Sequence, residues 1–96
     1  MMPLPSFRLD GNVAIVTGGA GVLGTLGARA FAAAGADIVL ADIVEKRALV
    51  EELEQTGRRV LAVRCDVSDP AAVDQMVSEV VAAFGASAGR AKKWPR

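Results

Sequence analysis

The sequence contains no histidine and no tyrosine, and it has a single cysteine, Cys65, and a single tryptophan, Trp94. Without histidine, the chain can form neither a Ser-His-Asp triad nor a metal site with imidazole ligands. One cysteine excludes an internal disulfide and a zinc site built from paired CxxC motifs. We therefore expect no bound metal, and we interpret Cys65 as a small, buried apolar residue.

Aromatic residues are also scarce, at 4% of the chain, whereas 52% of the residues are hydrophobic and 23% are charged. This composition excludes a disordered or collagen-like protein. A length of 96 residues allows one domain with a thin core. Because aromatic side chains are rare, we expect that core to be aliphatic.

The charges sum to zero, but they are unevenly distributed along the chain. All eleven acidic residues precede residue 85, and the segment after it carries four basic residues and no acid. We interpret this segment as a solvated tail rather than a surface for nucleic acid or membrane. The sequence shows neither a secretory signal nor an apolar run long enough to span a bilayer, so we expect a cytoplasmic protein.

Short apolar runs alternate with segments of helical periodicity. The runs are rich in β-branched residues and predict strands buried on both faces, as in a parallel sheet. Apolar residues three and four apart predict helices, each followed by a glycine. The predicted strands are 13–16, 38–41 and 60–63, and the predicted helices are 23–34, 45–56 and 70–84. This alternation predicts an α/β fold with right-handed crossovers.

Two details of this pattern can be checked directly. On the first predicted helix, Leu23, Leu26 and Phe31 share the face that we expect to cover the sheet. After Gly85 the pattern breaks, and no further strand is predicted. We therefore expect a leader at 1–11, one domain at 12–85 and a basic, disordered tail at 86–96, with no role for Trp94.

A glycine-rich segment lies between the first predicted strand and its helix. Gly18 permits a sharp exit from the strand, and Gly21 and Gly24 remove side chains where a pyrophosphate would come close. The start of the helix offers free N–H groups and a partial positive charge. The segment thus predicts a phosphate-binding loop; the alternative is that its glycines only shape the turn.

Two aspartates follow the second and third predicted strands. Asp42 lies where its carboxylate can accept hydrogen bonds from both ribose hydroxyls of an adenosine, which favours NAD over NADP, although Lys46 and Arg47 are near. Asp66 lies beside the expected adenine pocket. The alternatives are a solvated strand end for Asp42 and a turn acceptor near Ser68 for Asp66.

Together these features resemble the N-terminal part of a short-chain dehydrogenase/reductase. Three segments carry the resemblance: GNVAIVTGGAGVLG at 11–24, ADIVLAD at 36–42 and RCDVSD at 64–69. The glycine spacing departs from the common single-domain pattern, since Val22 stands where a glycine is usual. That spacing is better known in the extended, epimerase-like branch of the family, whereas the short second predicted helix and the compact loops resemble the single-domain oxidoreductase branch, which we favour.

The resemblance implies a cofactor site around the glycine-rich loop and the two aspartates. Its cofactor-binding residues would be Gly18, Gly21, Val22, Leu23, Gly24, Asp42, Ile43, Asp66 and Val67. It implies no catalytic residue, because the family's Asn-Asn-Ala-Gly, Ser and Tyr-x-x-x-Lys elements have no counterpart here. We expect a truncated chain, as a frameshift or premature stop would produce.

The fold implied is a partial Rossmann, or doubly wound, fold: a parallel three-stranded sheet in the order 3-2-1 with helices on both faces. The first strand would then be an exposed apolar edge, through which the chain could self-associate. The expected function is NAD binding without hydride transfer. The alternatives are a non-catalytic nucleotide-binding or interaction module and a remnant of a nucleotide-sugar epimerase.

Overall fold

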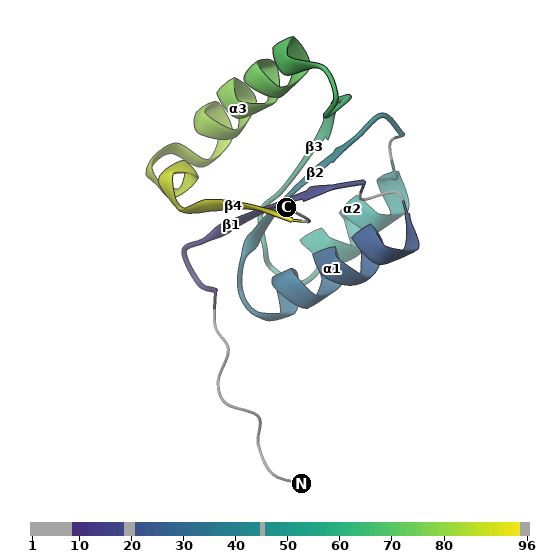
Figure 1. The fold of residues 1–96 in the computed structure, drawn as a ribbon. Coiled ribbons are helices and arrows are strands. Elements are labelled where there is room, and N and C mark those ends of the chain that lie inside the picture. Colours follow the sequence, from purple (N-terminus) through teal and green to yellow (C-terminus); the bar gives the residue numbers. More distant parts are fainter. Residues whose placement is uncertain (1–8, 19–20, 45, 95–96) are drawn as a thin grey trace, which may run out of the picture.

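The computed structural model of the chain describes residues 9–18, 21–44 and 46–94. Strands and helices alternate along these segments, and one short 3-10 helix, η1, precedes the last strand (Figure 1). The elements are β1 (Val13–Thr17), α1 (Val22–Ala33), β2 (Asp37–Asp42), α2 (Arg47–Glu54), β3 (Val60–Arg64), α3 (Pro70–Phe84), η1 (Gly85–Arg90) and β4 (Ala91–Trp94). The predicted alternation of strands and helices is therefore confirmed.

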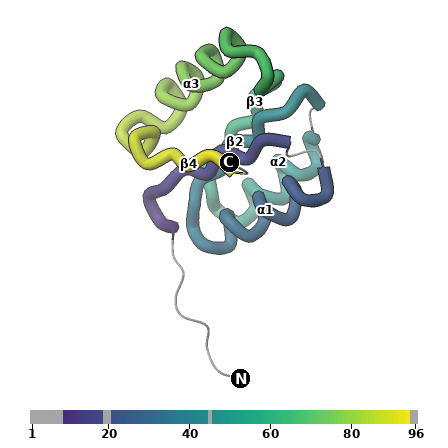
Figure 2. The backbone as a smooth tube through the Cα atoms, in the orientation of Figure 1, coloured from purple at the N-terminus to yellow at the C-terminus, as the bar shows by residue number. Residues whose placement is uncertain are grey.

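The strands form one parallel sheet in the order β3-β2-β1-β4. Helices α1 and α2 cover one face of this sheet and α3 covers the other (Figures 1 and 2). Asp69 caps α3 by accepting a hydrogen bond from the Ala71 N–H at 3.0 Å, and Pro70 occupies the first helical position. The α/β class and the helices on both faces were correctly predicted.

The central strands are buried on both faces, so their side chains supply two separate apolar clusters. On β1, Ala14 and Val16 pack toward α1 and α2, whereas Val13 and Ile15 pack toward α3. This alternation follows from the two-residue period of a strand. Cys65 belongs to the cluster under α3 and is 3% exposed, which confirms its interpretation as a buried apolar residue.

The expectation of three strands was wrong, because β4 adds a fourth beside β1. The register pairs Val13 with Ala91 and Val16 with Trp94. Ala91 packs on the cluster under α3, and Trp94 packs on the cluster under α1. One small and one aromatic residue thus attach this strand to the two faces, although the basic sequence between them shows no apolar run.

This pairing also changes the expected edges of the sheet. β1 has a neighbour on each side, so it is not the exposed apolar edge that the sequence analysis expected. The outer strand on this side is β4, whose Lys92 and Lys93 are exposed. Because lysines discourage strand addition, the structural basis for self-association through β1 is removed. The expected strandless tail is likewise wrong for residues 91–94.

The inward face of α1 is only partly the predicted one: Phe31 packs on the cluster under α1 as expected, but the two leucines do not. Leu23 and Leu26 are 67% and 55% exposed, whereas the buried residues of α1 are Gly24, Ala28 and Ala32. These small residues recur every four positions and let the helix lie close to the sheet. The apolar period placed the helix correctly, but side-chain size, rather than hydrophobicity, determined which face was buried.

Replacing Leu53 by alanine is expected to lower the free energy of unfolding by about 2–5 kcal/mol. Leu53 is 1% exposed and packs between α2 and the sheet, so its truncation leaves a cavity. The matched control is Leu26→Ala on α1, which should cost less than about 1 kcal/mol because Leu26 is largely in solvent. Denaturant unfolding measures both; equal losses in the two variants would contradict this packing.

Candidate functional site

The loops that leave β1, β2 and β3 lie next to one another at the end of the sheet where these strands finish. The Gly18 N–H donates to the Ala41 carbonyl at 3.1 Å, and the Cys65 N–H donates to the Asp42 carbonyl at 3.0 Å. These hydrogen bonds extend the strand pairing to the ends of the strands. Since the strands are parallel, all three loops follow carboxyl ends, where open α/β sheets bind ligands.

The glycine-rich segment turns the chain from β1 into α1. Gly18 has φ +69°, a left-handed conformation that side chains disfavour, and the Gly21 N–H donates to its carbonyl at 3.0 Å. Gly21 is the N-cap of α1; within the described segments, no side chain caps it and no acid lies in the first turn. The first N–H groups of α1 therefore have neither a side-chain cap nor a neighbouring carboxylate in the described segments, an arrangement that favours an anion.

A cavity of about 250 Å³ opens at this turn. Its lining consists of Thr17, Gly18, Gly21, Val22, Leu23, Gly24 and Trp94. The structure thus brings together the predicted residues of the glycine-rich loop. Thr17 and Trp94 were not among the predicted site residues. Thr17 could have been predicted, because it is the last residue of β1 and precedes the glycine-rich loop, but nothing in the sequence placed Trp94 beside β1. The volume is below the ~300–1,000 Å³ of a pocket for a whole drug-sized ligand.

Asp42 ends β2 and is half-buried. Its Oδ1 accepts hydrogen bonds from the Ile43 N–H at 2.6 Å and the Val44 N–H at 3.3 Å. The carboxylate is therefore oriented by the loop that it begins, while Ile43 is 58% exposed. Asp42 and Ile43 lie at the same edge of the sheet as the cavity but do not line it.

Asp66 and Val67 follow β3 and are both exposed. The Asp66 Oδ1 accepts hydrogen bonds from the Ser68 hydroxyl at 2.6 Å and the Ser68 N–H at 2.9 Å. These two bonds hold the pKa of Asp66 below its usual value, and the bond from the Ser68 hydroxyl has the larger effect. The alternative role of Asp66 as a turn acceptor is therefore observed, while its contact with an adenine stays a prediction.

Replacing Ser68 by alanine is expected to raise the pKa of Asp66 toward its ordinary value, because the stronger donor to its carboxylate is lost. A carboxyl with a lowered pKa stabilises the folded state above its unfolded pKa, and this contribution is lost as the pH falls through the folded pKa. NMR titration of the Asp66 side chain measures the change. Ser78→Ala is the control, since the Ser78 hydroxyl donates to the Asp74 carbonyl instead; an unchanged Asp66 pKa in Ser68→Ala would contradict the assignment.

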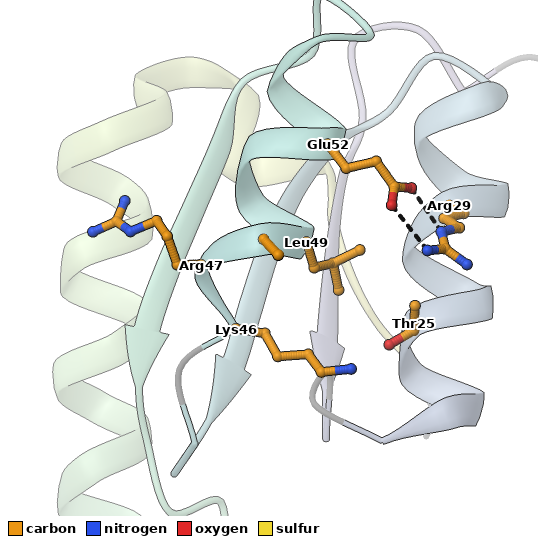
Figure 3. Close-up of a pocket in the computed structure, with 7 residues that line it drawn as sticks. Thr25, Arg29, Lys46, Arg47, Leu49 and Glu52 are labelled. Carbon is orange, nitrogen blue, oxygen red and sulfur yellow. Dashed lines mark hydrogen bonds and ion pairs between the residues drawn. The ribbon is translucent and has the colours of Figure 1, made fainter.

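A second hollow, of about 320 Å³, lies between α1 and α2 (Figure 3). Arg29 on α1 and Glu52 on α2 form a bidentate ion pair across it, with N–O distances of 2.6 and 2.9 Å. Lys46 extends from the start of α2 toward Thr25, whereas Arg47 points away from the gap (Figure 3). Basic side chains thus lie near the loop of Asp42, as the sequence analysis noted for Lys46 and Arg47.

The described segments contain no group of three histidine, cysteine, aspartate or glutamate side chains that could hold a metal ion. None of their helices is long and apolar enough to cross a membrane.

Comparison with protein families gives a match at residues 12–87 to the family described as short chain dehydrogenase. A similar curated protein is an uncharacterized oxidoreductase of Mycobacterium tuberculosis, 42% identical over 86 residues. That alignment covers 88% of this chain and 33% of the relative. The chain therefore spans about a third of the length of this relative.

Solved structures with the same arrangement include two nucleotide complexes. One is a blue fluorescent protein from a metagenomic library in complex with NADPH, with a TM-score of 0.71 and 40% identity; 81% of this chain and 34% of that chain align. The other is a short chain dehydrogenase from Burkholderia cenocepacia in complex with NADP, with a TM-score of 0.72 and 41% identity; the aligned shares are 81% and 33%.

Proposed function

Because the chain belongs to the short-chain dehydrogenase family, we propose that it binds a nicotinamide dinucleotide at the cavity that opens the first helix. The observation that carries this proposal is the start of α1, where an extended Gly21 and a left-handed Gly18 leave the first N–H groups without a side-chain cap in the described segments. A pyrophosphate supplies the oxygen acceptors and negative charge that this helix end favours.

The adenosine half of the dinucleotide lies, in this proposal, over the ends of β2 and β3. Asp42 accepts hydrogen bonds from the ribose hydroxyls, and Ile43 packs beside the sugar. Asp66 and Val67 hold the adenine. The hydrogen bonds that join the ends of β1, β2 and β3 support this placement, because they make the three loops neighbours.

We propose NAD as the preferred cofactor, since a 2′-phosphate would meet the negative charge of Asp42. NADP is the second candidate. Lys46 and the hollow between α1 and α2 lie near that loop, and both solved complexes named above contain NADP or NADPH. The two cofactors therefore have to be compared in one experiment.

The reaction proposed for the complete protein is hydride transfer between the cofactor and an alcohol or ketone. The 96 residues contain no tyrosine to donate a proton to such a substrate. We therefore expect cofactor binding without turnover from this chain alone. The family match favours this proposal over an epimerase remnant, and the pairing of β1 on both sides removes the open edge on which an interaction module would have relied.

Calorimetric titration of the 96-residue chain with ADP, NAD and NADP tests the proposal. We expect all three to bind, with NAD tighter than NADP, and no consumption of NADH with any ketone. Failure of ADP and NAD to bind to the folded chain, checked by circular dichroism, would overturn the proposal. Measurable turnover would overturn the expectation of an inactive chain.

A further inference from the structure

Trp94 occupies a position that the proposed function does not use. It ends β4 and pairs in register with Val16, so it lies at the same carboxyl-terminal end of the strands as Thr17 and Gly18. Its side chain is half-buried and forms part of the cavity wall with the glycine-rich loop. The single tryptophan of the chain therefore lies at the proposed pyrophosphate site.

The indole ring is held in place by α1. Its centroid lies 5.7 Å from that of Phe31, with the two rings edge to face at 74°. A Cβ on Gly27 would lie 2.7 and 2.8 Å from two atoms of the six-membered ring, which is too close for any side chain. The ring therefore rests directly on the backbone of α1. This packing holds the indole in its position at the cavity.

The order of the strands indicates toward which strand each half of a bound dinucleotide would extend. Asp42 ends β2 and Trp94 ends β4. These two strands lie on opposite sides of β1 (Figure 1). A dinucleotide whose pyrophosphate lies at the start of α1, and whose adenosine lies toward Asp42, extends its other half toward β4. On the β4 side, the cavity is lined by the indole of Trp94.

We propose that Trp94 binds the nicotinamide–ribose half of the dinucleotide, with the indole packed against the nicotinamide ring. This inference rests on the proposed function, because it needs the pyrophosphate at α1. In NAD the nicotinamide ring carries a positive charge, and a cation is attracted to the face of a tryptophan. That contact corresponds to roughly a 2- to 30-fold gain in affinity.

The test compares NAD with ADP-ribose, which lacks the nicotinamide ring, and with ADP. In the unchanged chain, NAD should quench the fluorescence of Trp94 more strongly than ADP-ribose does. By calorimetry, NAD should bind roughly 2- to 30-fold more tightly than ADP-ribose. Trp94→Ala should abolish this difference, while Trp94→Phe, which keeps an aromatic ring against α1, should retain part of it.

The outcomes separate the inference from the proposed function. ADP binding with equal affinities for NAD and ADP-ribose would overturn the role of Trp94 and leave the pyrophosphate site intact. Tighter NAD binding by Trp94→Ala would also overturn it, because the indole would then obstruct the ligand. If neither ADP nor NAD binds to the unchanged chain, both proposals fail. The fluorescence titration needs no variant, so it decides the question even if Trp94→Ala does not fold.

Discussion

Replacing Gly21 by valine is expected to reduce the affinity for NAD by more than about 100-fold while leaving the fold intact. Gly21 has φ −79° and ψ 167°, a conformation that any residue adopts, so the backbone is not strained. An added Cβ would lie 3.5 Å from the Gly18 carbonyl oxygen, an ordinary contact. The valine side chain would instead occupy space at the first N–H groups of α1, where the phosphate oxygens must approach.

The size of this effect follows from the hydrogen bonds that are lost. Each N–H bond to a charged group contributes about 1.5–3 kcal/mol, so losing two of them exceeds the ~2.7 kcal/mol that corresponds to 100-fold. Gly89→Val is the control: Gly89 lies in η1, away from the cavity, and an added Cβ meets nothing within 4 Å. Calorimetry with NAD and thermal unfolding measure both variants. Undiminished NAD binding by Gly21→Val would exclude a pyrophosphate at this helix.

Replacing Asp42 by alanine is expected to weaken NAD binding by about 10- to 100-fold and to bring the affinities for NAD and NADP close together. The NAD loss arises because the carboxylate no longer accepts from the ribose hydroxyls, and hydrogen bonds to a charged group are worth about 1.5–3 kcal/mol. The relative gain for NADP arises because the negative charge that repels a 2′-phosphate is gone, while Lys46 remains nearby.

A second variant separates the charge of Asp42 from its structural role. Asp42→Asn retains an oxygen that can accept from the Ile43 and Val44 N–H groups, so the loop should keep its shape. It should still shift the preference toward NADP, because the charge is removed. Asp74→Asn removes one charge from α3, which covers the face of the sheet opposite to α1 and α2 (Figure 1), and should change neither affinity. An unaltered NAD-to-NADP ratio in Asp42→Asn would contradict the proposed discrimination.

The sequence predicted the strands that are apolar along most of their length. β1 and β2 are buried on both faces and leave continuous apolar runs, such as residues 13–16. The edge strand β3 is only partly buried, but its residues 60–63 are also all apolar. β4 was missed because an edge strand needs only a few apolar contacts; here Ala91 and Trp94 supply them, and two exposed lysines interrupt the pattern. Its partner, β1, is also distant in the sequence, and no local pattern records such a pairing.

The same limit applies to the site. The glycine-rich loop could be predicted because its residues are consecutive and each glycine has a local conformational reason, as the left-handed Gly18 shows. Trp94 could not be predicted as part of the cavity, since it reaches the loop only through the pairing of β4 with β1. The hydrogen bonds from Ser68 to Asp66 were anticipated as an alternative, because an acceptor and a donor two residues apart form a common turn.

The position of β4 has a consequence for the order in which the sheet is made. Among the described strands, β1 is synthesised first and β4 last, so one hydrogen-bonding edge of β1 stays unpaired in a nascent chain until β4 has been made. Closing so long a stretch of polypeptide is entropically costly and slow. During that interval the unpaired edge of β1 is open to pairing with a wrong strand.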